Sequence, residues 1–236
     1  TYGSWRNNFL LISDDVDEKS DRIIQETTEL IAEDVKAAKP FLNVKKIHAD
    51  SYVQETSSGG ARYTLVNKAI FDALEVGAIV VNYFGHGGED GLAGERIFDK
   101  INAQELNNPC KLNCFVTVTC EYTKFDNPFR ETAGEYLFWN KKGGAISLIT
   151  TTRKIYVNVG TSFNKTLSQY LFSYGSDQTM SIGEALRRTK NDTAISGQPQ
   201  RRLVFNIGDP AIKLPIAKPD IRVTKINDED VNNSTQ

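Results

Sequence analysis

A histidine and a cysteine each follow an apolar run of the sequence. His86 comes directly after the β-branched and aromatic run at 78–85 and is flanked by three glycines. Cys120 ends a second such run, at 112–120. A thiol is an effective nucleophile as the thiolate, and an imidazole can take up its proton near neutral pH. The two residues could therefore form a catalytic pair for acyl transfer, provided that the fold brings them together.

The spacing of apolar residues predicts strands that alternate with helices. Continuous apolar strands separated by helices are typical of a parallel sheet that is covered on both faces. We therefore expect an α/β fold, a three-layer sandwich in which a mostly parallel sheet carries helices on both faces. The expected strands are 9–13, 43–49, 78–85, 112–120 and 143–152, the expected helices are 20–39, 61–77, 129–142, 160–175 and 181–194, and 202–216 is expected to form short extended pieces.

Helix-end signals sharpen two of these boundaries. Gly77 is expected to end the second helix as the residue after its last turn. Ser181 and Glu184 have the spacing of a capping box at the start of the last helix.

The topology expected for such a sheet places the histidine and the cysteine together. All carboxyl ends of a parallel sheet lie at one edge, and ligands bind there. The segment between His86 and Cys120 is long enough for one right-handed crossover to the adjacent strand. Gly87 would let a substrate backbone approach closely, with its own N–H free to donate a hydrogen bond to an oxyanion.

The composition excludes several classes of protein. The chain has 236 residues, of which 39% are hydrophobic and 25% charged, and its formal net charge is −2. This balance leaves no electrostatic footprint for nucleic acid, and no apolar run reaches the ~18 residues of a membrane span. The three cysteines lack paired metal-ligand spacing. We expect no cofactor and no metal.

The ends of the chain suggest its domain organisation. Thr1 is expected to begin an excised or processed piece, because there is no initiator Met and no signal-peptide pattern. Residues 1–217 are expected to form one catalytic domain or subdomain. Residues 218–236 are expected to be a linker or the start of a following β domain, partly disordered.

Other polar residues give weaker signals. His48 ends the second expected strand and faces the same edge, but a surface polar role is favoured for it. An acidic pair after the first strand, here Asp14 and Asp15, is also a feature of receiver domains, where it binds Mg²⁺. That class needs a phosphoacceptor Asp at the end of the third strand, where this chain has a histidine. The stretch at 85–90 departs from the G-x-G-x-x-G nucleotide fingerprint at its last glycine and lacks a second histidine for a metal site.

Three segments of the chain resemble one peptidase family. They are YFGHGGEDGLAG at 83–94, FVTVTCEYTKFDNP at 115–128 and FNIGDPAIKLP at 205–215. They resemble the gingipain-like cysteine peptidases of the caspase-haemoglobinase type, and among these most of all the cell-surface sortases of type IX secretion. The opening GSWRNNFLLISDDVD is similar to the start of the larger catalytic subdomain. The resemblance implies a caspase-like fold.

The same resemblance implies roles for individual residues. It makes Cys120 the nucleophile and His86 the general acid and base, with the backbone N–H groups of Gly87 and Cys120 as the oxyanion hole. It makes Asp15, with Asp14 beside it, the acid that orients the imidazole.

The resemblance also implies two residues that contact the substrate, Asp21 and Glu121. Asp21 falls at the start of the first helix, where arginine-cleaving members shape their specificity pocket. The loop before it is shorter here, so a preference for a basic substrate residue does not follow. Glu121 departs from the small apolar or amide residue that is common in gingipains. Its negative charge beside the thiol works against fast general proteolysis.

The resemblance finally implies a function and its partners. The substrate would be the C-terminal signal domain of a secreted cargo protein, and water or an amine of a surface glycolipid would accept the acyl group. An outer-membrane barrel protein of the PorV type would hold the enzyme at the cell surface. The competing interpretations are a non-catalytic caspase-like scaffold or adaptor of a secretion machine, and a self-processing caspase-like protease that internal autocleavage would reveal.

Overall fold

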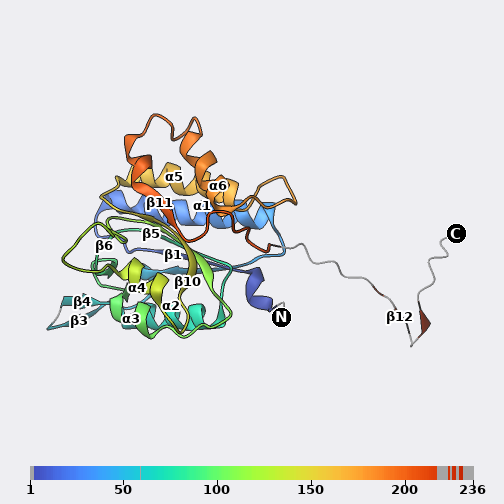
Figure 1. Ribbon diagram of the computed structural model, residues 1–236. Coiled ribbons are helices and arrows are strands. Elements are labelled where there is room, and N and C mark those ends of the chain that lie inside the picture. Colours follow the sequence, from blue (N-terminus) through green and yellow to red (C-terminus); the bar gives the residue numbers. More distant parts are fainter. Residues whose placement is uncertain (1–2, 59, 217–222, 224, 227–228, 231–236) are drawn as a thin grey trace.

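A six-stranded sheet forms the centre of the molecule (Figure 1). The computed structural model describes residues 3–58, 60–216, 223, 225–226 and 229–230. Across the sheet the strands lie in the order β11–β10–β9–β5–β1–β2, and all pairings are parallel except that of β10 with β11. The strands are β1 (Asn8–Ser13), β2 (Asn43–His48), β5 (Val80–Phe84), β9 (Asn113–Val118), β10 (Ala145–Thr151) and β11 (Val204–Ile207).

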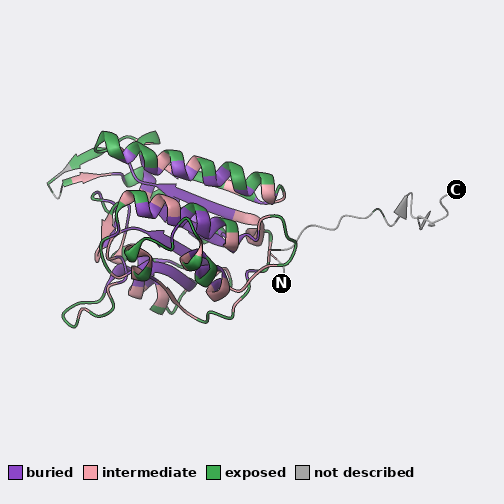
Figure 2. Cartoon of the chain, turned by 90° about the horizontal axis from the view of Figure 1, so that it is seen from above, coloured by how far each residue is buried: buried purple, intermediate pink, exposed green. Residues whose placement is uncertain are grey.

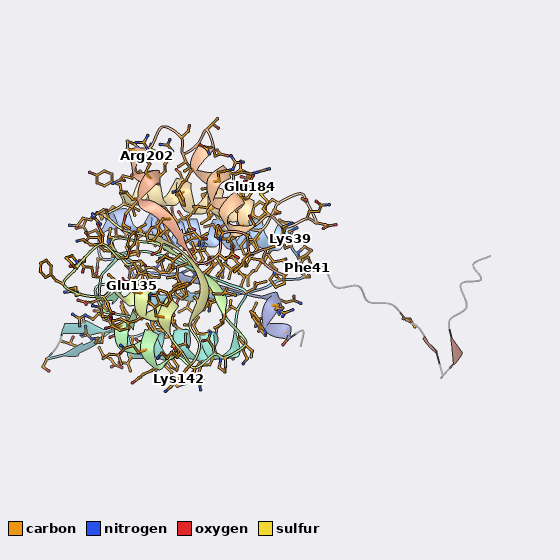
Figure 3. The ribbon with its side chains drawn as sticks, viewed as in Figure 1. Lys39, Phe41, Glu135, Lys142, Glu184 and Arg202 are labelled. Carbon is orange, nitrogen blue, oxygen red and sulfur yellow. The ribbon has the colours of Figure 1, made fainter. Side chains whose placement is uncertain are left out.

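Helices cover both faces of this sheet, as the ribbon shows (Figure 1). One layer consists of α1 (Arg22–Ala38), α5 (Val157–Leu171) and α6 (Ile182–Asn191). The other consists of α2 (Thr64–Val76), α3 (Lys100–Glu105) and α4 (Ala133–Trp139). In Figure 3, Glu184 and Arg202 lie in the outer part of the first layer, and Lys142 lies at the far side of the second. The expected three-layer α/β architecture is confirmed.

The strands alternate their side chains between two hydrophobic cores. In β1, Phe9 and Leu11 pack under α1 and α5, whereas Leu10 and Ile12 pack against the α2 side. Both sets are buried, so neither face of β1 is exposed to solvent, and Figure 2 shows the central strands largely buried. This two-sided burial explains why the strands read as continuous apolar runs. It also fixes their register, because a slip of one residue would exchange the two cores.

Several elements differ from the sequence expectation. The polar segment before α2 forms a hairpin of β3 (Glu55–Ser57) and β4 (Gly60–Arg62), so the second helix starts at Thr64 rather than at residue 61. The last sheet strand, β11, runs antiparallel. Three two-residue strands that the apolar pattern did not indicate lie between His86 and α3: β6 (Gly87–Gly88), β7 (Gly91–Leu92) and β8 (Phe98–Asp99).

The helix ends agree with the expectation in one case and differ in the other. Gly77 follows α2 with φ 101° and donates its N–H to Ala73 O, so its expected role is confirmed. Ser181 caps α6 by accepting the N–H of Glu184 at 3.3 Å. The reciprocal half of the predicted box is replaced, because the Glu184 carboxylate pairs with Arg187 and Arg188 instead.

Short 3-10 turns and the C-terminal segment complete the chain. The turns are η1 (Ser4–Asn7), η2 (Lys19–Asp21), η3 (Ala49–Ser51) and η4 (Pro199–Leu203). Most of the segment expected as a linker or following β domain, 218–236, lies outside the described residues; within it, β12 (Lys225–Ile226) pairs with β13 (Glu229–Asp230). Among the helices of the described part, none is long and apolar enough to cross a membrane.

Candidate active site

His86 and Cys120 lie on adjacent loops at the carboxyl edge of the sheet. β5 and β9 are parallel neighbours, and their register pairs Phe84 with Val118. His86 and Cys120 each follow two residues after that pair. The two loops also touch, because a Cβ on Gly87 would lie 2.6 Å from the Thr119 hydroxyl oxygen. The adjacency that the sequence predicted for the two loops is thus present.

The backbone of His86 is held on both sides. Its N–H donates to Asp14 Oδ2 at 2.7 Å, and its carbonyl accepts the hydroxyl of Tyr83 at 2.5 Å. Gly85 makes this possible, since a side chain there would collide with Asp14 and with the Tyr83 hydroxyl. The glycine before the histidine is therefore required by close packing.

The imidazole ring of His86 is paired with a carboxylate. Its Nε2 lies 3.4 Å from Asp21 Oδ1. The Asp21 side chain is only 6% exposed, whereas the ring is 48% exposed. The second oxygen of Asp21 accepts the backbone N–H of Glu18 at 2.9 Å, which fixes the carboxylate at the start of the first helical segment. A fixed acid therefore supports a ring that a substrate can reach.

Asp15, for which the orienting role is predicted, makes a different contact. Its Oδ2 accepts the hydroxyl of Tyr63 at 3.0 Å. In this structure the acid beside the ring is Asp21, and the orienting role of Asp15 stays a prediction.

Asp14 acts on the backbone of the same loop. Burial raises its pKa to about 8; the hydrogen bond from the His86 N–H opposes this rise, and the neighbouring charges of Asp15 and Glu95 add to it.

Cys120 is the half-buried thiol among three cysteines of different exposure. Its Sγ lies 3.8 Å from the carbonyl oxygen of Ile155, to which it can donate. The next residue, Glu121, has φ 54°, a left-handed conformation that is uncommon outside glycine and concentrates at functional sites. Cys110 is exposed, whereas Cys114 is fully buried and its pKa is raised to about 12 by burial. Of the three thiols, Cys114 is thus closed off in the core, Cys110 lies at the surface, and Cys120 lies at the edge of the sheet.

Comparison with known proteins identifies the family. The sequence model of peptidase family C25 matches residues 1–215. The chain belongs to peptidase family C25.

Solved structures agree with this assignment at the level of the fold. The Arg-specific cysteine proteinase gingipain R (RgpB) superposes with a TM-score of 0.70 at 18% identity, over 89% of this chain and 48% of that one. The complex of the pro- and mature domains of RgpB from Porphyromonas gingivalis gives 0.67 at 16% identity, over 88% of this chain and 48% of that one. A structure described as a protease gives 0.67 at 15% identity, over 94% of this chain and 51% of that one. The chain spans about half the length of these proteins. No curated protein matches it.

A charged network, which the sequence analysis did not foresee, ties the loop after Cys120 to the loop after His86 in this C25 chain. Lys124 Nζ lies 3.3 Å from Glu89 and 3.2 Å from Glu121. Glu89 also accepts the amide of Asn127 at 2.8 Å and pairs with Arg130 at 3.2 Å. The negative charge of Glu121 therefore has a cationic neighbour. The local sequence gave no sign of the pairs that Glu89 makes, because they join residues more than 30 positions apart, whereas Lys124 and Glu121 are three positions apart.

His48 forms a second polar chain that has the residue types of a hydrolase triad. Ser13 Oγ lies 2.6 Å from His48 Nδ1, and His48 Nε2 lies 2.7 Å from Glu29 Oε1. The serine, however, is fully buried at the end of β1, while Glu29 is the exposed member, on α1. A nucleophile in that position is out of reach of a substrate. The polar role favoured for His48 is therefore a structural one, since its ring links β2 to Ser13 on β1 and to Glu29 on α1.

Proposed function

We propose that this chain is the catalytic subdomain of a cysteine endopeptidase, with Cys120 and His86 as its catalytic pair. The observation that carries the proposal is the β5–β9 register, which brings the thiol and the imidazole onto adjacent loops at one edge of the sheet. The difference in exposure between His86 and Asp21 also supports the proposal, because the imidazole is accessible to a substrate and the carboxylate beside it is buried.

The proposed reaction is acyl transfer in two steps. The Cys120 sulfur forms a bond to the substrate carbonyl carbon, and His86 takes the thiol proton and delivers it to the departing amine as the C–N bond breaks. Water or another amine then attacks the thioester, and its proton returns through His86 to the leaving thiolate. The backbone N–H groups of Gly87 and Cys120 are proposed to bind the oxyanion.

Asp21 is proposed to hold the imidazole for this proton transfer. It occupies Nε2 at 3.4 Å, so Nδ1 is the ring nitrogen that remains for the thiol and the leaving group. Substrate contact remains a second proposed role for Asp21 and is also proposed for Glu121, which stands directly after the nucleophile.

The finer proposal is a PorU-like sortase of type IX secretion. The enzyme would act at the cell surface beside an outer-membrane barrel of the PorV type. It would remove C-terminal signal domains from cargo and transfer the cargo to water or to a glycolipid amine. The resemblance of the segments at 83–94, 115–128 and 205–215 supports this assignment.

A thiol-reactivity experiment separates the peptidase from a non-catalytic scaffold without requiring the substrate. The rate of alkylation by dilute iodoacetamide at neutral pH is followed at each cysteine by mass spectrometry. We expect Cys120 to react at least 10-fold faster than Cys110 and to lose that advantage in His86→Ala. The matched control is His48→Ala, which removes the other histidine and should leave the rate at Cys120 unchanged. Equal rates at Cys120 and Cys110, or no effect of His86→Ala, would favour the scaffold.

The substrate assignment needs a separate assay. A cargo C-terminal signal domain is incubated with the protein and an amine acceptor, and the products are identified by mass. Cleavage that requires Cys120 supports the sortase proposal. Cleavage of unrelated peptides at comparable rates would refute the sortase proposal, while the peptidase proposal would stand.

A further inference from the structure

Two threonines lie where neighbouring strands end beside the turn that carries Cys120. β9 and β10 are parallel neighbours, so both strands end at the carboxyl edge of the sheet. Thr151 is the last residue of β10, and Thr119 stands between the end of β9 and the cysteine. Both threonines are buried. A hydroxyl that is buried as deeply as that of Thr151 needs a hydrogen-bond partner, and its partner lies in the Cys120 turn.

Thr151 holds this turn at both of its ends. Its hydroxyl donates to the carbonyl oxygen of Thr119, directly before the cysteine. Its own carbonyl oxygen accepts the N–H of Thr123 at 3.1 Å, on the other side of the turn. Between these two contacts Glu121 has φ 54°, a conformation that persists only where the surrounding structure holds it. One residue of β10 therefore fixes both ends of a strained turn.

The bond to the Thr119 carbonyl also fixes the direction of the Cys120 N–H. The carbonyl and the N–H of one trans peptide unit lie in a single plane and point to opposite sides. A donor that holds the carbonyl therefore sets where the N–H points. Within the described part of the chain, the Cys120 N–H has no hydrogen-bond acceptor of its own. It is thus free to donate to an oxyanion that forms on a substrate.

We propose that Thr151 is a positioning residue for the acyl transfer, because it holds the Cys120 N–H in the direction that the oxyanion needs. This inference rests on the peptidase function proposed above. Thr151 acts through the peptide unit that joins Thr119 to Cys120, not on the reacting atoms. Loss of a donor from an oxyanion hole commonly lowers kcat about 100- to 1,000-fold. Here the N–H remains and only its support is lost, so we expect a smaller effect.

Thr117 on β9 offers a matched control. Its hydroxyl donates to the hydroxyl of Thr150 at 2.9 Å, and its side chain is also fully buried. That bond joins β9 to β10 and does not involve the peptide unit before Cys120. Thr117→Val and Thr151→Val thus each remove one buried hydroxyl from neighbouring strands, but only the second removes a support of the Cys120 N–H.

The test compares two reactions of Cys120 in the full chain. p-Nitrophenyl acetate acylates the thiol through an oxyanion, whereas iodoacetamide alkylates it by displacement at a saturated carbon, where no oxyanion forms. Nitrophenolate release and peptide mapping give the two rates, with Cys110 as the internal reference. We expect Thr151→Val to lower the acylation rate about 10- to 100-fold and to leave the alkylation rate unchanged. Thr151→Ser keeps the hydroxyl and should restore most of the acylation rate, and Thr117→Val should leave both rates unchanged.

The folding of each variant is checked by thermal unfolding, and Thr151→Ala is the second variant without the hydroxyl if Thr151→Val does not fold. Acylation at the parent rate in the hydroxyl-free variant would overturn the inference. An equal loss in Thr151→Ser or Thr117→Val, or a matching fall in the alkylation rate, would also overturn it. If the parent protein is acylated no faster at Cys120 than at Cys110, the peptidase proposal itself is refuted, and this inference with it.

Discussion

The contact between Asp21 and His86 leads to a quantitative prediction. Two unit charges separated by 3.4 Å interact by about 5 kcal/mol at an effective dielectric constant of 20 and by about 1 kcal/mol in bulk water. The ring is half exposed, which favours the lower part of this range, about 1–2 kcal/mol for the protonated imidazole. If the proton transfer limits the rate, Asp21→Asn should lower kcat about 5- to 30-fold.

The assay must separate positioning of the ring from recognition of the substrate. Turnover of Asp21→Asn and Asp15→Asn is compared with that of the control Asp17→Asn under the same conditions. The peptides vary only in the residue before the cleaved bond. We expect Asp21→Asn to lower kcat by the same factor for every peptide, with KM little changed. A loss confined to peptides with a basic residue at that position, or a larger loss in Asp15→Asn than in Asp21→Asn, would refute the positioning role.

Two further predictions concern the same edge of the sheet. The methyl group of Gly87→Ala would lie 2.6 Å from the Thr119 hydroxyl oxygen, so we expect at least a 10-fold loss of peptidase activity. The control Gly88→Ala should retain activity, because a methyl group there meets nothing within 4 Å. Equal losses in the two variants would contradict the packing argument. The pKa of Asp14 rises from 3.8 in the unfolded chain to about 8 in the folded protein, so the folded state holds the extra proton and its stabilising effect is complete below pH 3.8 and lost as the pH rises toward 8. Urea unfolding should show the free energy of unfolding falling by up to about 1.4 kcal/mol per pH unit in that window, and Asp14→Asn should remove this slope. An identical slope in the variant would show that Asp14 is not the titrating group.

The sequence predicted the framework of the molecule because its strongest signals are local. A strand buried on both faces is largely apolar, and β1, β5, β9 and β10 were recognisable for that reason. The neighbouring positions of His86 and Cys120 followed from the direction that parallel strands share. Gly77 was readable for a similar reason, since its positive φ suits glycine.

The remaining features depend on contacts between distant residues. The polar hairpin of β3 and β4 has no apolar alternation to reveal it. The approach of Asp21 to the imidazole depends on how the loop after β1 turns back toward β5. Glu95 reaches Asp14 only through the small strands β6–β8, whose two-residue lengths lie below what a periodic pattern can show.

The central claim is that Cys120 forms a covalent acyl intermediate with the help of His86. The most direct measurement is active-site labelling with a peptidyl acyloxymethyl ketone, followed by intact mass and peptide mapping. We predict one adduct per chain, located on Cys120, abolished in His86→Ala and unchanged in Cys110→Ser. An adduct on Cys110, or undiminished labelling of Cys120 in His86→Ala, would contradict the account.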